Sequence, residues 1–228
     1  MHGNIETEGG FMKKLLAFTL AETLIVIGII GVVSALTLPN LNSSTGEKEK
    51  VAKVKKIYQN LDDAVGRAVA TYGPIEEWFA NDTTEEAKVT RFADRITEFM
   101  KISKKIDDAR YILADGTLIW VFSHIDSANG TCDRAASYPE KNLCYSIYVD
   151  IDGPNKGKNT AGYDQFNFLA IESGVLPDDT SAHHNVGNKA AYTNDGVYYA
   201  AAWVIMNENM DYLKCFNELN WTNKTSCK

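Results

Sequence analysis

The longest apolar stretch of the chain runs from Phe18 to Leu41 and carries a single charge, Glu22. It reads FTLAETLIVIGIIGVVSALTLPNL, and a strongly polar segment follows it. A helix rises about 1.5 Å per residue, so this stretch would reach about 36 Å. Because the hydrocarbon core of a bilayer is about 30 Å thick, the pattern predicts a transmembrane helix over residues 18–41.

An amphipathic helical pattern follows the polar segment. Apolar residues recur at three- and four-residue spacing from Val51 to Tyr72, which places them on one face of a helix. Gly73 and Pro74 then predict the end of that helix. We therefore expect one long helix from Phe18 to about Tyr72, half transmembrane and half amphipathic, whose second half needs a sheet to pack on.

Beyond this helix the pattern becomes partly alternating. Thr83 to Glu86 is typical of a capping box that starts a short helix. Mixed aromatic and β-branched stretches then predict a hairpin and three further strands, over residues 111–113, 117–122, 143–149, 166–171 and 197–205. A long helix followed by consecutive strands predicts an α+β fold, with an antiparallel sheet packed on the helix.

Composition limits the function classes. The chain has 228 residues, 45% of them hydrophobic and 23% charged, which suits one globular domain and an anchor. The net charge of −7 gives no strong signal for nucleic-acid binding, because phosphates call for a basic surface. No Ser/His/Asp set, phosphate loop or paired-carboxylate motif stands out, so we do not expect an enzyme.

The four cysteines all follow the apolar stretch, and none forms the CxxC spacing of a zinc site. An even number in an exported domain favours disulfides. Of the three possible connectivities we favour Cys132–Cys144 and Cys215–Cys227, because each of these pairs closes a short loop. The alternative is four free, buried thiols.

The residues before the apolar stretch do not have the order of a secretory signal. Lys13 and Lys14 supply the charged region, but the small residue Ala17 precedes the apolar core, so cleavage there would leave that core on the mature chain. This order, in KKLLAFTLAETLIVIGIIGVVSALTLPNL, closely resembles the class III leader and N-terminal helix of the type IV pilin and type II secretion pseudopilin superfamily.

The resemblance implies a processing site and an assembly helix. Prepilin peptidase would cut between Ala17 and Phe18, and Phe18 would become N-methylated, although the family usually has glycine before the cut. Glu22 would be the fifth mature residue, where the family keeps its glutamate, and Pro39 matches the family's proline. The family has a pilin fold, so we expect a leader at 1–17, a transmembrane and assembly helix at 18–41 and a globular domain at 42–228. Residues 1–11 are unlike a leader, and Met12 is a candidate true start.

Glu22 has a physical role of its own. A lone carboxylate in lipid costs at least about 2.5–3.5 kcal/mol, so it needs a partner, and the freed amine of Phe18 in a neighbouring subunit would supply one. The alternative places Glu22 at the headgroups, in contact with water. Lys13 and Lys14 predict a cytoplasmic N-terminus. We therefore expect a single-pass protein of the bacterial cytoplasmic membrane that later enters a periplasmic or cell-surface filament.

One loop has the composition of a cation site. Asp150, Asp152, Asn155 and Asp164 lie in a Gly-rich connection between two predicted strands, and calcium prefers oxygen ligands of these kinds. The pattern is not an EF-hand, but it resembles the calcium loop of secretion pseudopilins. The alternative is a loop whose Asp and Asn side chains bind their own backbone in Asx-turns. No other cofactor is expected.

These observations predict a structural subunit of a type IV pilus or a type II secretion pseudopilus. The resemblance implies a homopolymer with minor pilins, and contacts with prepilin peptidase, an inner-membrane assembly platform and membrane lipid. The alternative is a monomeric, membrane-anchored, extracytoplasmic ligand-binding protein.

Overall fold

The computed structural model describes residues 20–125, 132–134, 142–172, 174–178, 200–220 and 223–227, with the side chains of 34–45 and 133–134 excepted. The chain divides into two compact units, residues 1–45 and 46–228. Helix α1 (Leu20–Tyr72) begins in the first unit and ends in the second, and each unit is described by itself.

The described side chains of the first unit, residues 20–33, are all exposed. Among the residues that the structure describes, no helix combines the length and the apolar character that crossing a membrane requires.

This finding corrects two expectations. The pilin fold with a half-transmembrane N-terminal helix is wrong, because no helix among the described residues is long and apolar enough to cross a membrane. The single-pass location in the cytoplasmic membrane is contradicted for the same reason. The processing residues Ala17 and Phe18 lie outside the described residues. Pro39 falls within the bounds of α1, but its side chain is not described.

The second unit begins with the amphipathic part of α1, whose apolar stripe is buried from Val51 to Ala68. Gly73 follows with a φ of +82°, a left-handed conformation in which glycine ends helices at little cost. A short 3₁₀ helix, η1 (Ile75–Glu77), leads to α2 (Glu85–Thr97). The N-cap of α2 is Thr84, which accepts a hydrogen bond from the amide of Ala87 at 3.2 Å, so the predicted cap at Thr83 is wrong by one residue.

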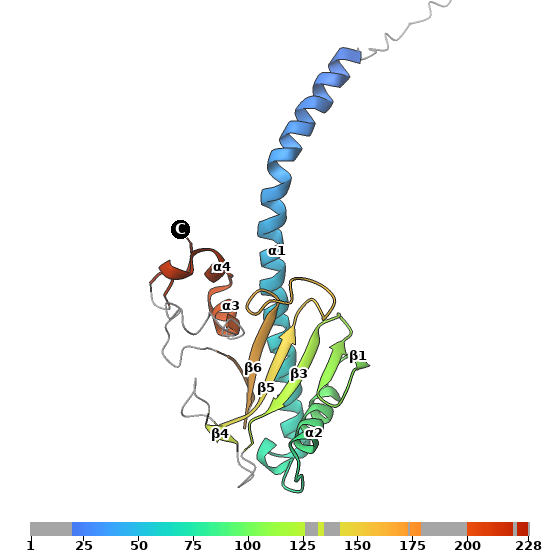
Figure 1. Ribbon diagram of the computed structural model, residues 1–228, viewed down its shortest axis with the longest axis vertical. Helices are drawn as coiled ribbons and strands as arrows, with labels where there is room; N and C mark the ends of the chain where they lie inside the picture. Colours follow the sequence, from blue (N-terminus) through green and yellow to red (C-terminus); the bar gives the residue numbers. More distant parts are fainter. Residues whose placement is uncertain are drawn as a thin grey trace, which may run out of the picture. The chain divides into compact units, whose positions relative to one another are not determined.

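The sheet contains β1 (Ile102–Lys105), β2 (Arg110–Leu113), β3 (Leu118–Ser123), β4 (Asp133–Arg134), β5 (Asn142–Asp150), β6 (Gln165–Ile171) and β7 (Gly174–Pro177). Its order is β1-β2-β3-β5-β6-β7, and β4 also pairs with β5 (Figure 1). Each pairing between these strands is antiparallel. The predicted hairpin of β2 and β3 is confirmed, as are the strands β5 and β6.

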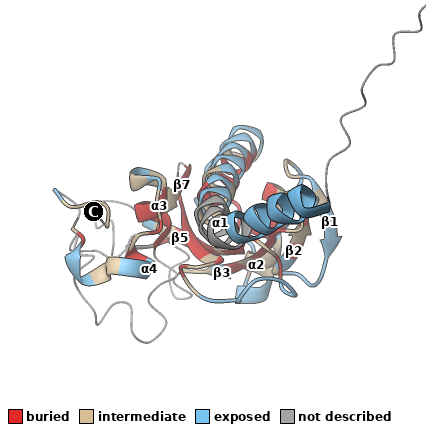
Figure 2. Ribbon diagram, turned by 90° about the horizontal axis from the view of Figure 1, so that it is seen from above, coloured by how far each residue is buried: buried red, intermediate tan, exposed pale blue. Residues whose placement is uncertain are grey.

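One hydrophobic core joins the strands to α1 and α2 within the second unit. Phe92 of α2 stacks on Tyr145 of β5, with 4.0 Å between ring centroids, and Tyr58 of α1 stacks on Phe168 of β6 at 6.0 Å. Figure 2 shows the buried positions of these strands and helices. The core lies on the face of the sheet that α1 and α2 cover, and β6 is buried along nearly its whole length.

The C-terminal region departs from the prediction of a last strand over 197–205. Residues 201–205 instead form most of the short helix α3 (Ala201–Asn207), and residue 200 immediately precedes it. Residues 197–199 lie outside the described residues. A short apolar run does not distinguish a strand from a buried helix, and the alanines at its start favour the helix. Helix α4 (Tyr212–Cys215) and the 3₁₀ helix η4 (Phe216–Glu218) follow.

Both predicted disulfides are confirmed. Cys132 and Cys144 join the start of β4 to β5, with 4.5 Å between their Cα atoms. Cys215 and Cys227 close the C-terminal region, with 5.7 Å between Cα atoms.

Candidate functional site

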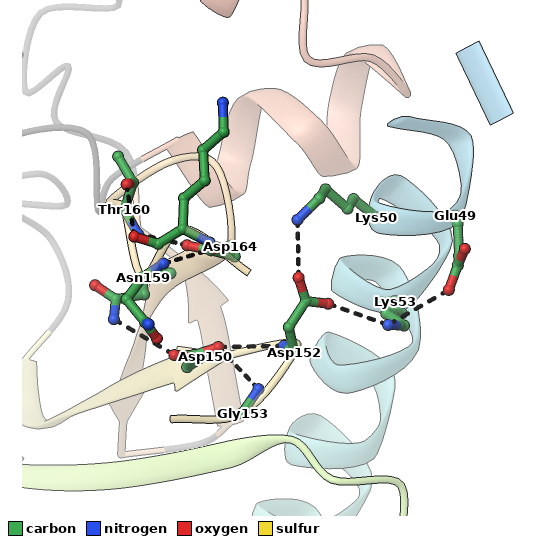
Figure 3. A network of polar contacts seen from close by, with 11 residues as sticks. Glu49, Lys50, Lys53, Asp150, Asp152, Gly153, Asn159, Thr160 and Asp164 are labelled. Carbon is green, nitrogen blue, oxygen red and sulfur yellow. Dashed lines mark hydrogen bonds and ion pairs between the residues drawn. The ribbon is translucent and has the colours of Figure 1, made fainter. Parts of the chain in front are cut away.

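The predicted cation ligands lie on the connection between β5 and β6. Asp150 ends β5, and Asp164 immediately precedes β6; both are buried. Asp152 lies in the first turn of the connection, whereas Asn155 is exposed. The structure therefore brings three carboxylates to one end of the sheet (Figure 3).

Asp150 holds the first turn of the connection. Its carboxylate accepts hydrogen bonds from the amides of Asp152 at 3.2 Å and Gly153 at 2.9 Å, and from the side-chain amide of Gln165 at 3.4 Å. Burial raises the pKa of Asp150 above its usual value, because the charged form is desolvated, although these hydrogen bonds oppose the rise.

Asp164 holds the second turn. One carboxylate oxygen accepts from the amides of Lys158 at 2.6 Å and Asn159 at 3.0 Å, and the other accepts from the amide of Thr160 at 2.5 Å. Asn159 has a φ of +47°, a left-handed conformation that asparagine tolerates better than most residues. The carboxylate thus satisfies three backbone donors that the turn would otherwise leave unpaired.

Asp152 connects the loop to α1. Its two oxygens accept hydrogen bonds from Lys50 at 3.0 Å and from Lys53 at 3.1 Å, and both lysines come from the helix (Figure 3). Burial alone would raise the pKa of Asp152, but the two ammonium groups outweigh it and hold that pKa below its usual value. Lys50 also lies over the ring of Tyr163, 4.2 Å from its centroid, which adds a cation–π contact.

The same surface of α1 fixes two more loops. Lys55 pairs with Glu208 after α3, at 2.5 Å, and Lys56 pairs with Asp115 in the β2–β3 turn, at 2.8 Å. These pairs are more exposed than the Lys50–Asp152 pair, so solvent screens them more strongly. The lysines after the apolar stretch therefore hold the loops at one end of the sheet.

Gly157 shows how closely the β5–β6 connection is packed. A Cβ atom at this position would lie 2.4 Å from an oxygen of Asp164 and 2.8 Å from an oxygen of Asp152, and the φ of +66° also disfavours other residues. The two carboxylates therefore pack directly on the glycine backbone. The sequence marks this turn only as Gly-rich and does not reveal which carboxylates surround it.

In this arrangement the three carboxylates do not form a calcium site. They accept from backbone amides and lysines, and Asn155 does not join them. Within the described ranges, no group of three or more His, Cys, Asp or Glu side chains is placed to hold a metal ion. Calcium binding would require new positions for Lys50 and Lys53, and it stays a prediction.

A pocket of about 980 Å³ lies beside this loop, and sequence reasoning did not predict it. Asp150 and Pro154 line one end of it, and residues of β3, α2 and the β1–β2 turn line the rest. Its floor includes Trp120, which stacks on Tyr148 of β5 with 5.4 Å between centroids. Alternation along β3 was the available signal, because it places Trp120 and Phe122 on the face opposite the core.

Comparison with known proteins identifies no relative: neither a family model, nor a curated protein, nor a solved structure matches the chain.

Proposed function

We propose that the chain is a structural subunit of a helical fibre, of the type IV pilus or type II secretion pseudopilus class that residues 13–41 resemble. Its copies associate through the part of α1 at residues 20–33. One observation carries the proposal: large aliphatic side chains in this segment are at least 53% exposed. They are Leu20, Leu24, Ile25, Val26, Ile27, Ile29, Ile30, Val32 and Val33.

These side chains surround the helix and do not form a single stripe. Successive residues of a helix are rotated by about 100°, so the consecutive run from Leu24 to Ile27 already faces every direction. A helix that is apolar on all sides is normally buried on all sides. A single docking partner would cover one side, whereas several neighbouring copies would cover them all.

The energetics favour several neighbours. Complete burial of a large aliphatic side chain is worth about 1.5–3 kcal/mol. Because the side chains of 20–33 are roughly half exposed, each has on the order of 1 kcal/mol left to gain. Association itself costs about 4–15 kcal/mol, so contact along one face gives little net affinity. Enclosure by several copies buries every face of the segment, and the summed gain from its side chains exceeds the cost of association.

Glu22 supplies the register in this proposal. It is the only charged residue among residues 20–33, and it is exposed in the isolated chain. Enclosing a carboxylate in apolar surroundings is costly unless it meets a positive partner. Cleavage after Ala17 by a prepilin peptidase would create such a partner, the α-amine of Phe18 in a neighbouring copy. Minor pilins and an assembly platform complete the proposed set of partners.

The test is electron microscopy of sheared surface fibres, with N-terminal sequencing of their subunit. We expect fibres that contain this chain, beginning at Phe18, and we expect Glu22→Ala to abolish them while the protein is still produced. Glu49→Ala is the matched control, because Glu49 is an exposed glutamate on the same helix. Normal fibres from Glu22→Ala, or a mature chain with another first residue, would refute the proposal. A monomeric binding protein would retain its function in Glu22→Ala.

A further inference from the structure

The pocket beside the β5–β6 connection is lined by none of residues 20–33, on which the proposed assembly rests. It follows β3 from Leu118, next to Asp150, to Ser123 at the other end of the strand. Strand β2 begins only at Arg110, opposite Trp120, so the residues of β3 that follow Trp120 border the pocket. At about 3.3 Å per residue, the six residues of β3 make the pocket roughly 17 Å long.

Aromatic rings form the floor of the pocket. Tyr148 covers one face of the Trp120 indole, with an angle of 11° between the rings. In the strand register Trp120 lies between Tyr148 and Arg110, and both Trp120 and Arg110 line the pocket. Phe122, 49% exposed, contacts Tyr148 edge-on and extends the aromatic surface along the strand. An indole face attracts cations more strongly than the other aromatic faces do.

The rim of the pocket is acidic. Five carboxylates and the guanidinium of Arg110 line it. Of these, Asp150 is buried and accepts from backbone amides, and Glu85 pairs with Lys88 at 2.9 Å. Asp107 pairs with Arg110, and Asp108 pairs with Lys105 of β1. Glu86, at the start of α2, has no hydrogen-bond or ion-pair partner for its carboxylate among the described residues. The carboxylates occur at both ends of the aromatic floor, with Asp150 at one end and the α2 and β1–β2 residues at the other.

We propose that this pocket binds an extended, basic peptide segment of a partner polypeptide, with lysine or arginine side chains over Trp120 and beside Glu86. The charge of the rim selects a cationic occupant, and the aromatic floor provides cation–π contacts to it. The net charge of the whole chain, −7, also attracts basic partners.

Length and volume favour a peptide over a small organic cation. The volume of about 980 Å³ is at the upper end of the range for small-ligand sites, about 300–1,000 Å³, and a single ammonium group would fill little of it. In an extended peptide, side chains on one face repeat every two residues, which matches the spacing of Leu118, Trp120 and Phe122 along β3. A peptide of about five residues would span the pocket.

The test uses the full chain, as wild type and as Glu22→Ala, so that the result does not depend on fibre assembly. The probe is the pentapeptide acetyl-KLKLK-amide, and the control is the same peptide with every lysine acetylated. Calorimetry should show saturable binding of the first that weakens as salt is added, and much weaker binding of the second. Equal affinity for the two peptides, or no saturable binding of the charged one, would overturn the proposal.

Variants locate the binding in the pocket. Trp120→Leu should lower the affinity for the charged peptide by roughly 2- to 30-fold, and Glu86→Gln should lower it by roughly 1.5- to 5-fold. Glu77→Gln, an exposed glutamate outside the pocket, should change nothing. If Trp120→Leu does not fold, Phe122→Leu replaces it as the aromatic variant. Unchanged affinity in a folded aromatic variant and in Glu86→Gln would overturn the proposal.

The source of the peptide follows from fibre assembly in the pocket variants. Loss of fibres in Trp120→Leu, with Glu22 intact, would show that a second copy of this chain supplies the basic segment. Normal fibres together with weakened peptide binding would show that another protein supplies it. Both results support the pocket as a site for basic peptides.

Discussion

Replacing Asp152 with asparagine tests the contact between α1 and the β5–β6 connection. The side chains of Lys50 and Asp152 are only 14% and 17% exposed, so Asp152→Asn leaves Lys50 charged and largely shielded from water. Loss of a partner for such a group costs about 1–2 kcal/mol. Lys53 is 41% exposed, so solvent screens its pair and its loss adds only about 0.3 kcal/mol. We expect the free energy of unfolding to fall by about 2 kcal/mol.

Urea and thermal unfolding, followed by circular dichroism, measure this change. For a unit of this size, 1 kcal/mol corresponds to about 2–4 °C in Tm, so the expected loss is about 4–8 °C. Asp63→Asn is the matched control, because Asp63 is an exposed carboxylate on α1 whose partner, Arg67, lies one turn away. It should change the free energy of unfolding by less than about 0.5 kcal/mol.

The pH dependence provides an independent check. The pKa of Asp152 is lower in the folded than in the unfolded chain, where it is about 3.9. A depressed carboxyl pKa stabilises the fold above the unfolded pKa, and that stability is lost as the pH falls through the folded pKa. The difference between wild type and Asp152→Asn should therefore be constant from pH 5 upward and shrink below about pH 4. Equal stability of the two proteins at pH 7 would refute the reasoning.

Three further predictions follow from the described residues. Gly157→Ala should lower the free energy of unfolding by about 2 kcal/mol or more, because φ is positive there and the new methyl group clashes with two carboxylates. Gly66→Ala, on α1 with open space around it, should raise that free energy by up to about 1 kcal/mol. Urea unfolding measures both changes. Replacing Cys132 and Cys144 together with serine should lower the free energy of unfolding by about 2–4 kcal/mol, and unchanged urea midpoints would contradict this. The calcium prediction is tested by titrating the chain with calcium in a calorimeter and by measuring Tm with and without chelator. No heat of binding and an unchanged Tm would reject the prediction made from the sequence.

Local patterns predicted the parts of the fold that depend on neighbouring residues. The strands β2, β3, β5 and β6 have alternating or continuous apolar residues between turn signals, and they form as expected. The strand expected at 197–205 failed because apolar residues alone do not separate a strand from a buried helix, and tertiary packing around Trp203 decides it. The predicted membrane span has no counterpart among the described residues, where no helix is long and apolar enough to cross a membrane.

The candidate sites could be predicted only in part, for a related reason. Sequence composition placed Asp150, Asp152 and Asp164 in one loop, and the structure agrees with that placement. It could not show that Lys50 would neutralise Asp152, because 102 positions separate the two residues. The pocket was equally hidden, since its lining comes from four separate segments of the chain.

The polar segment after the apolar stretch has a different role from the one its charge suggests. Lys50, Lys53, Lys55 and Lys56 pair with carboxylates of three different loops in the second unit. Each pair is modest, but together they fix the end of the sheet that holds Asp150 and hence one wall of the pocket. In the two proposals, the charges of α1 therefore serve the peptide site and its apolar residues at 20–33 serve assembly.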